Sequence, residues 1–139
     1  TSTSKLSIAI SIGESIYKHW SLSLSTTNTK TNPQTKNLTF QILGSSNRYR
    51  FDINHNQTNP LASNDLIQMI YLYDVDTSHL QTIRSIAEKT VIHNEIPSYN
   101  CQDYVLDLLD LLEKSGVIDN QDEGYVRNKG VVKGMQEGL

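Results

Sequence analysis

The chain has 139 residues, a hydrophobic fraction of 37% and a formal net charge of −3, a length that suits one domain with a single core. The charge gives no electrostatic basis for binding nucleic acid or an anionic membrane, and one cysteine excludes an internal disulfide. Since no apolar run reaches about 18 residues, we expect no membrane span. The start of the sequence lacks a signal-peptide pattern and the cysteine is single, so we expect a cytoplasmic, reducing location.

Period-two alternation predicts strands through residues 1–76. "KLSIAISIG" (5–13) alternates Leu and Ile with Ser and Ala, and "SIYKHWSLSLS" (15–25) repeats the pattern with His19 in mid-strand and Trp20 on the other face. A polar loop over residues 26–37 separates these from "LTFQIL" and "RYRFDIN", whose spacing across "GSSN" suits a hairpin. "LIQMIYLYDV" (66–75) predicts a longer strand that could be central, although its apolar run also fits a helix.

From residue 77 to 116 the spacing of apolar residues predicts two helices. "DTSHLQTIRSIAEKTVI" (76–92) places apolar side chains on one helical stripe, with Ser78 and Gln81 as a possible capping box. The second helix follows Asn100, a favoured N-cap residue, and ends near Gly116. Residues 117–139 form a charged, glycine-rich tail that is either partly helical or frayed. We therefore expect one α+β domain over 1–139, with a small, mostly antiparallel sheet packed against the second helix.

The single cysteine, Cys101, falls in the first turn of this second helix and on its buried stripe, four residues before Val105. Unpaired N–H groups and the helix dipole favour an anion there, so we expect the pKa of the thiol to be lowered. A lone cysteine on an apolar stripe can equally be an ordinary core residue. His19 makes the catalytic interpretation worth testing, because a helix-start thiol and a strand imidazole are the parts of an activated nucleophile.

The two motifs together, "HW" at 19–20 and "NCQDYV" at 100–105, resemble the circularly permuted papain-like superfamily. That superfamily includes the lecithin:retinol acyltransferase-like proteins, the PPPDE peptidases and permuted relatives of the NlpC hydrolases. The resemblance implies a histidine strand that precedes the cysteine helix, with Cys101 as nucleophile and His19 as base and later acid. It also implies a third polar residue on a neighbouring strand, for which Gln41 and Asp52 are the candidates.

These residues predict a cysteine-dependent acyl-transfer enzyme, either a hydrolase, a peptidase or an acyltransferase, acting on a peptide, acyl or small-molecule substrate through an acyl-thioester. The alternatives are a catalytically inactive papain-like fold that binds a peptide or small ligand, and a structural partner protein. The sequence has no zinc-ligand spacing, calcium loop or glycine-rich phosphate loop, so we expect no metal or cofactor.

Overall fold

The computed structural model describes residues 3–12, 17–27, 35–45, 47–56 and 66–137. The described residues form a five-stranded sheet of order β4-β3-β2-β1-β5, in which each strand runs antiparallel to its neighbours. The strands are β1 (Thr3–Ser11), β2 (His19–Thr27), β3 (Thr35–Leu43), β4 (Arg50–Asn56) and β5 (Leu66–Asp76). The predicted antiparallel sheet and the hairpin between β3 and β4 are therefore confirmed.

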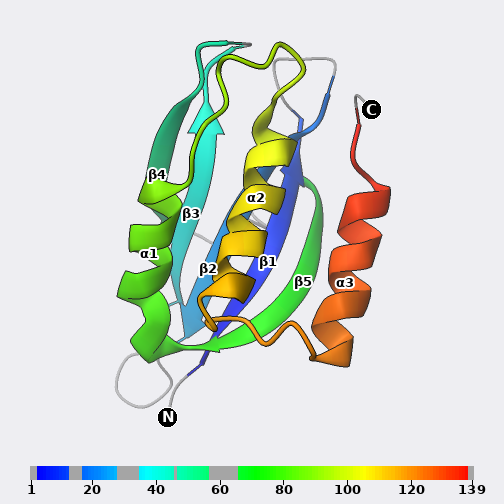
Figure 1. The fold of residues 1–139 in the computed structure, drawn as a ribbon. Helices are drawn as coiled ribbons and strands as arrows, with labels where there is room; N and C mark the ends of the chain where they lie inside the picture. The colour runs from blue at the N-terminus through cyan, green and yellow to red at the C-terminus, as the bar shows by residue number, and fades with distance from the viewer. Residues whose placement is uncertain (1–2, 13–16, 28–34, 46, 57–65, 138–139) are drawn as a thin grey trace.

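Three α-helices among the described residues cover one face of this sheet (Figure 1). They are α1 (Leu80–Lys89), α2 (Cys101–Lys114) and α3 (Glu123–Gly134), and a short 3-10 turn, η2 (Thr77–His79), leads into α1. The middle helix, α2, packs on β2 and β3, whereas α3 packs on β5. This is a two-layer α+β arrangement.

The core lies between the two layers because the strands alternate. Leu6, Ile8 and Ile10 of β1 are buried, as are Trp20, Leu22 and Leu24 of β2 and Phe40 and Ile42 of β3. From the helical layer, α2 contributes buried side chains at the spacing of one helical stripe: Cys101, Tyr104, Val105, Leu108, Leu109 and Leu112. Alternate strand residues, including Ser7, Ser21 and Gln41, consequently point to the second face of the sheet.

The helix α2 begins at Cys101 after the predicted N-cap Asn100, and a capping box that was not predicted from the sequence fixes this start. The Asn100 side chain accepts hydrogen bonds from the backbone N–H groups of Gln102 at 2.9 Å and Asp103 at 3.4 Å. In return, the Asp103 carboxylate accepts the Asn100 N–H at 3.0 Å. The chain leaves the helix through Gly116, whose φ of 86° is a left-handed conformation that glycine adopts without strain.

Several details of the prediction were wrong or lie outside the described residues. His19 begins β2 rather than lying in mid-strand, because the Lys18 N–H is bonded to Glu137 instead of to a strand. The strands β2 and β3 also extend into the predicted loop, to Thr27 and from Thr35. The predicted strand residues 15–16 and loop residues 28–34 are outside the described part of the chain.

The longest strand, β5, lies at an edge of the sheet and not at its centre. Its apolar content is explained by α3, which packs against it with the Tyr73 and Tyr125 rings 5.8 Å apart. The tail therefore contains a full helix, which the sequence pattern concealed because only Tyr125 and Val132 of α3 are buried.

The cap before α1 also differs from the prediction. The Asp76 carboxylate accepts the Ser78 N–H at 2.9 Å, and no capping box forms between Ser78 and Gln81. Asp76 takes this role because the helical turn η2 begins at Thr77, so that Asp76 and not Ser78 is the N-cap residue. No helix in the described ranges has the length and apolar character needed to cross a membrane.

Candidate functional site

Cys101 lies where the N-terminus of α2 meets the start of β2. Its sulfur accepts a hydrogen bond from the Trp20 N–H, with a distance of 3.4 Å between N and Sγ. The thiol in turn faces the Lys18 carbonyl oxygen, 3.8 Å away. These two groups belong to the peptide units on either side of the His19 Cα, so the sulfur lies directly beside the His19 backbone.

The sulfur accepts a hydrogen bond from a β2 amide that lies beyond the pairing of β2 with β3. The pairing between β2 and β3 runs from Leu22↔Phe40 to Thr27↔Thr35, and Trp20 lies beyond its last pair. The Trp20 N–H therefore needs another acceptor, since buried amides are almost always paired. The first turn of α2 supplies it with Cys101 Sγ.

His19, Gln41 and Asp52 form a hydrogen-bonded chain across three neighbouring strands. The His19 Nε2 lies 2.7 Å from Gln41 Oε1, and the Gln41 amide nitrogen donates to Asp52 Oδ2 at 3.0 Å. Gln41 and Asp52 are direct partners in the β3–β4 register. The structure thus joins both candidate third residues to the histidine, one behind the other.

The series of hydrogen bonds from Asp52 to His19 determines which imidazole nitrogen carries the proton. The Asp52 carboxylate only accepts, so the Gln41 NH₂ must face it and the Gln41 oxygen must face the ring. An amide oxygen also only accepts, so His19 Nε2 is the protonated nitrogen. In the neutral ring the lone pair is consequently on Nδ1, the nitrogen that can receive a proton.

The hydrogen-bonded residues His19, Gln41 and Asp52, which we call the relay, lie on a different side of the β2 backbone from the thiol. Gln41 lies between Phe40 and Ile42, which are buried beneath the helices, so the relay lies on the sheet face away from the helices. Cys101 reaches the same backbone from the helical layer. Among the described residues, the thiol's hydrogen-bond partners are the two backbone groups of Lys18 and Trp20, and the imidazole is not one of them.

The expected lowering of the Cys101 pKa was wrong for the thiol in this arrangement. Burial raises the pKa of the Cys101 thiol, whose residue is 9% exposed. The N–H groups of Trp20, Cys101 and Gln102 act in the opposite direction, while the Asp103 charge raises the pKa further. Desolvation therefore outweighs the helix start, and the resting thiol is neutral.

An aromatic cluster from two loops borders the first turn of α2. Tyr49 and Tyr99 meet edge to face with 6.5 Å between ring centroids, and His93 meets Tyr99 at 5.4 Å. The Asn94 side chain holds the Tyr49 backbone by accepting its N–H at 2.8 Å and donating to its carbonyl at 3.0 Å. Burial and the nearby Cys101 and Asp103 raise the pKa of Tyr49. Nothing in the local sequence pattern indicates this pairing of distant loops.

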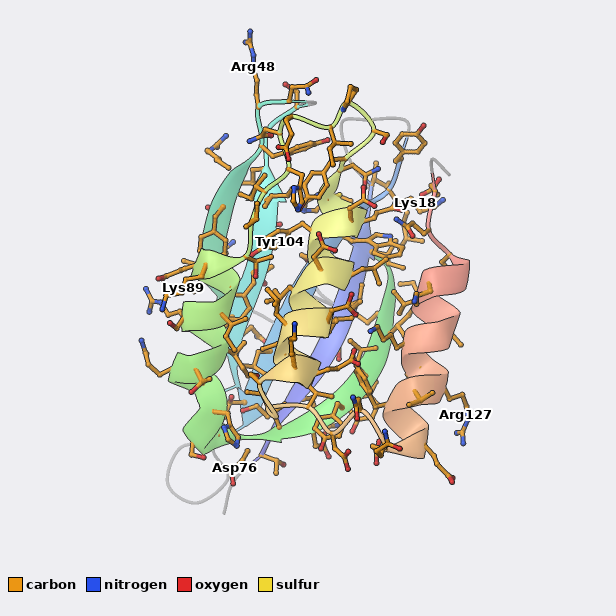
Figure 2. The ribbon with its side chains drawn as sticks, in the orientation of Figure 1. Lys18, Arg48, Asp76, Lys89, Tyr104 and Arg127 are labelled. Carbon is orange, nitrogen blue, oxygen red and sulfur yellow. The ribbon has the colours of Figure 1, made fainter. Side chains whose placement is uncertain are left out.

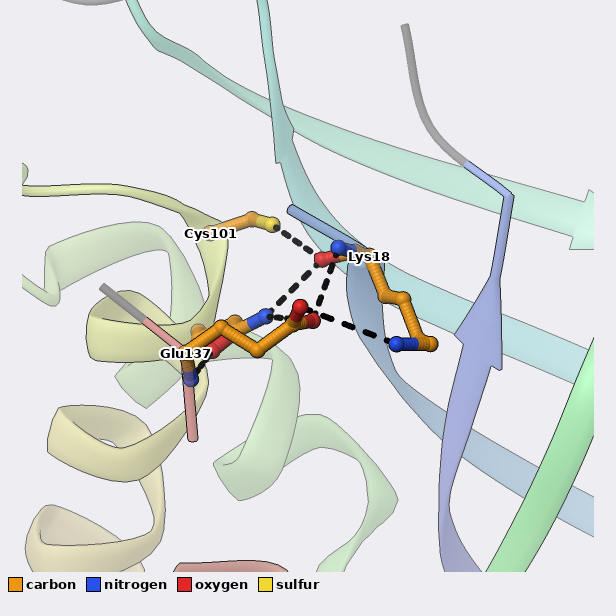
Figure 3. Close-up of polar contacts among 4 residues, drawn as sticks. Lys18, Cys101 and Glu137 are labelled. Carbon is orange, nitrogen blue, oxygen red and sulfur yellow. Dashed lines mark hydrogen bonds and ion pairs between the residues drawn. The ribbon is translucent and has the colours of Figure 1, made fainter. Parts of the chain in front are cut away.

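The sequence interpretation also missed Gln102, Lys18 and Glu137, which contact one another beside Cys101 (Figure 3). Gln102 is fully buried, although it follows the cysteine directly. The signal available in the sequence was spacing, since Gln102 lies three residues before Val105 and seven before Leu109, on the apolar stripe where an amide needs hydrogen-bond partners. Figure 2 shows Lys18 toward the same end of the molecule as Arg48, far from Asp76.

Within the described ranges, no group of three or more His, Cys, Asp or Glu side chains could hold a metal ion.

The comparisons with known proteins give one match. No curated protein and no solved structure matches the chain significantly. Residues 7–119, which contain all four predicted site residues, match the model of a family of unknown function (DUF6540). The chain therefore belongs to this DUF6540 family.

Proposed function

We propose that this protein is a cysteine-dependent acyl-transfer enzyme in which Cys101 is the nucleophile and His19 is the general base and then the general acid. The observation that carries the proposal is the relay from Asp52 through Gln41 to His19 Nε2, which leaves Nδ1 free to accept a proton. The Cys101 sulfur reaches the His19 backbone from the helical side, so the reaction requires the imidazole and the thiol to meet around the start of β2, beyond the last pair with β3. A nucleophile, a base and a group that orients the base are the parts such chemistry requires.

In the proposed reaction, His19 Nδ1 takes the proton from Cys101 Sγ while the sulfur attacks the substrate carbonyl carbon. The resulting tetrahedral intermediate collapses, His19 gives the proton to the leaving group, and an acyl-thioester remains on Cys101. Water or an amine, deprotonated by His19, then attacks the thioester and releases the acyl group and the thiol.

The raised thiol pKa favours proton transfer to His19 during attack over a thiolate that already exists at rest. The imidazolium that forms keeps its Nε2–H on Gln41, and Gln41 is held by the Asp52 carboxylate. Asp52 thus stabilises the positive ring through an intervening amide. The Cys101 N–H, in the first turn of α2, is the donor that we assign to the developing oxyanion.

The chain order agrees with the resemblance to circularly permuted papain-like enzymes, since the histidine strand β2 precedes the cysteine helix α2. Such an enzyme would act on a peptide, acyl or small-molecule substrate. We expect it to act in the reducing cytoplasm, where the single thiol stays free.

The test uses the fact that the chain has one cysteine. The parent is mixed with p-nitrophenyl acetate and quenched in acid, and its intact mass is measured with and without hydroxylamine, which cleaves thioesters. We expect a hydroxylamine-sensitive acetyl adduct on the parent and none on Cys101→Ala. His19→Ala should slow adduct formation by about 100-fold or more, whereas the control His79→Ala, in the distant η2 turn, should not.

The alternative is a catalytically inactive fold that binds a ligand or acts as a structural partner. The observation that favours it is the thiol itself, which is buried, neutral and bonded to backbone groups. If the parent forms no thioester with activated esters, or if His19→Ala forms it as quickly, the enzymatic proposal is wrong and this alternative stands.

A further inference from the structure

The C-terminal end of the described chain returns to the candidate site after α3. Gln136 donates to the Asp103 carboxylate at 2.8 Å, and the Glu137 N–H donates to Gln102 Oε1 at 2.8 Å. Both contacts fall on the first turn of α2, directly after Cys101. We call residues 136–137 the C-terminal latch.

The Glu137 carboxylate joins that first turn to the start of β2 (Figure 3). Its Oε1 accepts the Lys18 N–H at 3.0 Å and the Gln102 side-chain amide at 3.4 Å. Its Oε2 lies 3.6 Å from Lys18 Nζ, in an ion pair that is partly exposed to water. One carboxylate thus holds the residue before His19 and the residue after Cys101.

The Lys18 carbonyl oxygen closes this network onto the thiol. It accepts the Gln102 amide at 3.0 Å and also faces Cys101 Sγ at 3.8 Å. If Glu137 releases the Lys18 N–H and the Gln102 amide, Lys18 loses its anchor one peptide unit before His19. The Lys18 carbonyl oxygen that faces the sulfur is then held less firmly, whereas the Trp20 N–H stays on β2 beside its β1 partner Ile10.

We propose that Glu137 is a positioning residue that holds Cys101 and His19 in register by anchoring Lys18 and Gln102. This inference rests on the proposed function for its catalytic meaning, since it assigns Glu137 no contact with substrate. The anchoring itself is measurable on the thiol, whether or not the protein turns over a substrate.

The test compares iodoacetamide alkylation of Cys101 in the full chain, followed by intact mass across pH, for the parent, Glu137→Ala and Glu137→Gln. Loss of the anchor should admit water and reagent to the sulfur, so we expect Glu137→Ala to alkylate about three- to tenfold faster. Acetylation by p-nitrophenyl acetate should become slower in the same variant, because it needs the sulfur aligned with His19. Glu137→Gln should lie between the two proteins, since its amide oxygen can still accept the Lys18 N–H.

The matched control is Glu88→Ala on α1, which removes an acidic partner of Arg84 in a comparable exposed ion pair. Equal alkylation rates for the parent and Glu137→Ala would overturn the inference. An acceleration that Glu88→Ala reproduces would also overturn it, because the effect would then be general destabilisation. A parent that forms no acetyl-thioester would refute the proposed enzyme, while the alkylation rates would still decide the role of Glu137.

Discussion

Replacing Gln41 by Leu tests the relay most directly, because it removes both hydrogen bonds of one side chain. His19 Nε2–H loses its acceptor at 2.7 Å and Asp52 loses its donor at 3.0 Å. While the ring is neutral, the first bond contributes about 1 kcal/mol. In the transition state the ring is an imidazolium, and a bond from a charged donor contributes about 1.5–3 kcal/mol.

Losing this difference of about 0.5–2 kcal/mol raises the barrier, so if the relay supports the reaction, Gln41→Leu should slow acyl-thioester formation by about 2- to 30-fold. Asp52→Asn should have a smaller effect than Gln41→Leu, because its amide oxygen still accepts from Gln41 and only the charge is lost. The assay is the rate of hydroxylamine-sensitive acetyl adduct formation after rapid mixing with p-nitrophenyl acetate.

Gln68→Leu is the matched control, since Gln68 is an exposed glutamine on the edge strand β5. The reasoning fails if Gln41→Leu reacts as quickly as Gln68→Leu while both remain folded. It also fails if Asp52→Asn is the slower of the two relay variants, because the amide contacts the ring and the carboxylate does not.

Three further results are expected. The rate of Cys101 alkylation by iodoacetamide should rise with pH through an inflection above 9.0, the ordinary pKa of the thiol. Burial raises this pKa, so the reactive thiolate forms only at higher pH. An inflection below about pH 8 would contradict this expectation. Asn100→Ala should lower the free energy of unfolding by about 1 kcal/mol, since the first turn of α2 loses its N-cap, and urea titration would detect no change if the cap were unimportant. Gly44→Ala should destabilise the fold by about 1–3 kcal/mol, because φ is 124° and the new Cβ would lie 2.5 Å from the Arg48 carbonyl oxygen. Gly130→Ala, in open space on α3, should instead stabilise the fold by up to about 1 kcal/mol. Thermal melts in which both variants shift in the same direction would refute this contrast.

The sequence predicted those elements whose stability is local or whose apolar residues repeat. Asn100 and Asp103 form the predicted start of α2 because capping involves neighbours in the chain. The serine–leucine alternation of β2 predicted one buried face because strand side chains point alternately to two sides. Gln41 and Asp52 were recognisable as candidates because each is a polar side chain that faces away from the apolar residues of its strand.

Other features depend on pairings between distant segments, which a single sequence does not encode locally. The edge position of β5 follows from which strands find partners, not from its own composition. The sequence likewise indicated a lowered thiol pKa from the helix start, but the amount of desolvation depends on how α2 packs on β2. The aromatic cluster around Tyr99 and the contact of Glu137 with Lys18 have the same origin.

The hydrogen bond between Lys18 and Glu137 joins residues 119 positions apart, which has a consequence for biosynthesis. The hairpins of the sheet bring together residues that are near in sequence and can form while the chain is still being made. The contact of Glu137 with the Lys18 N–H cannot form until residue 137 has left the ribosome. A nascent chain can therefore hold its central strands and still lack the finished surroundings of Cys101, so the thiol's reactivity should reach its final value only after synthesis has passed this point.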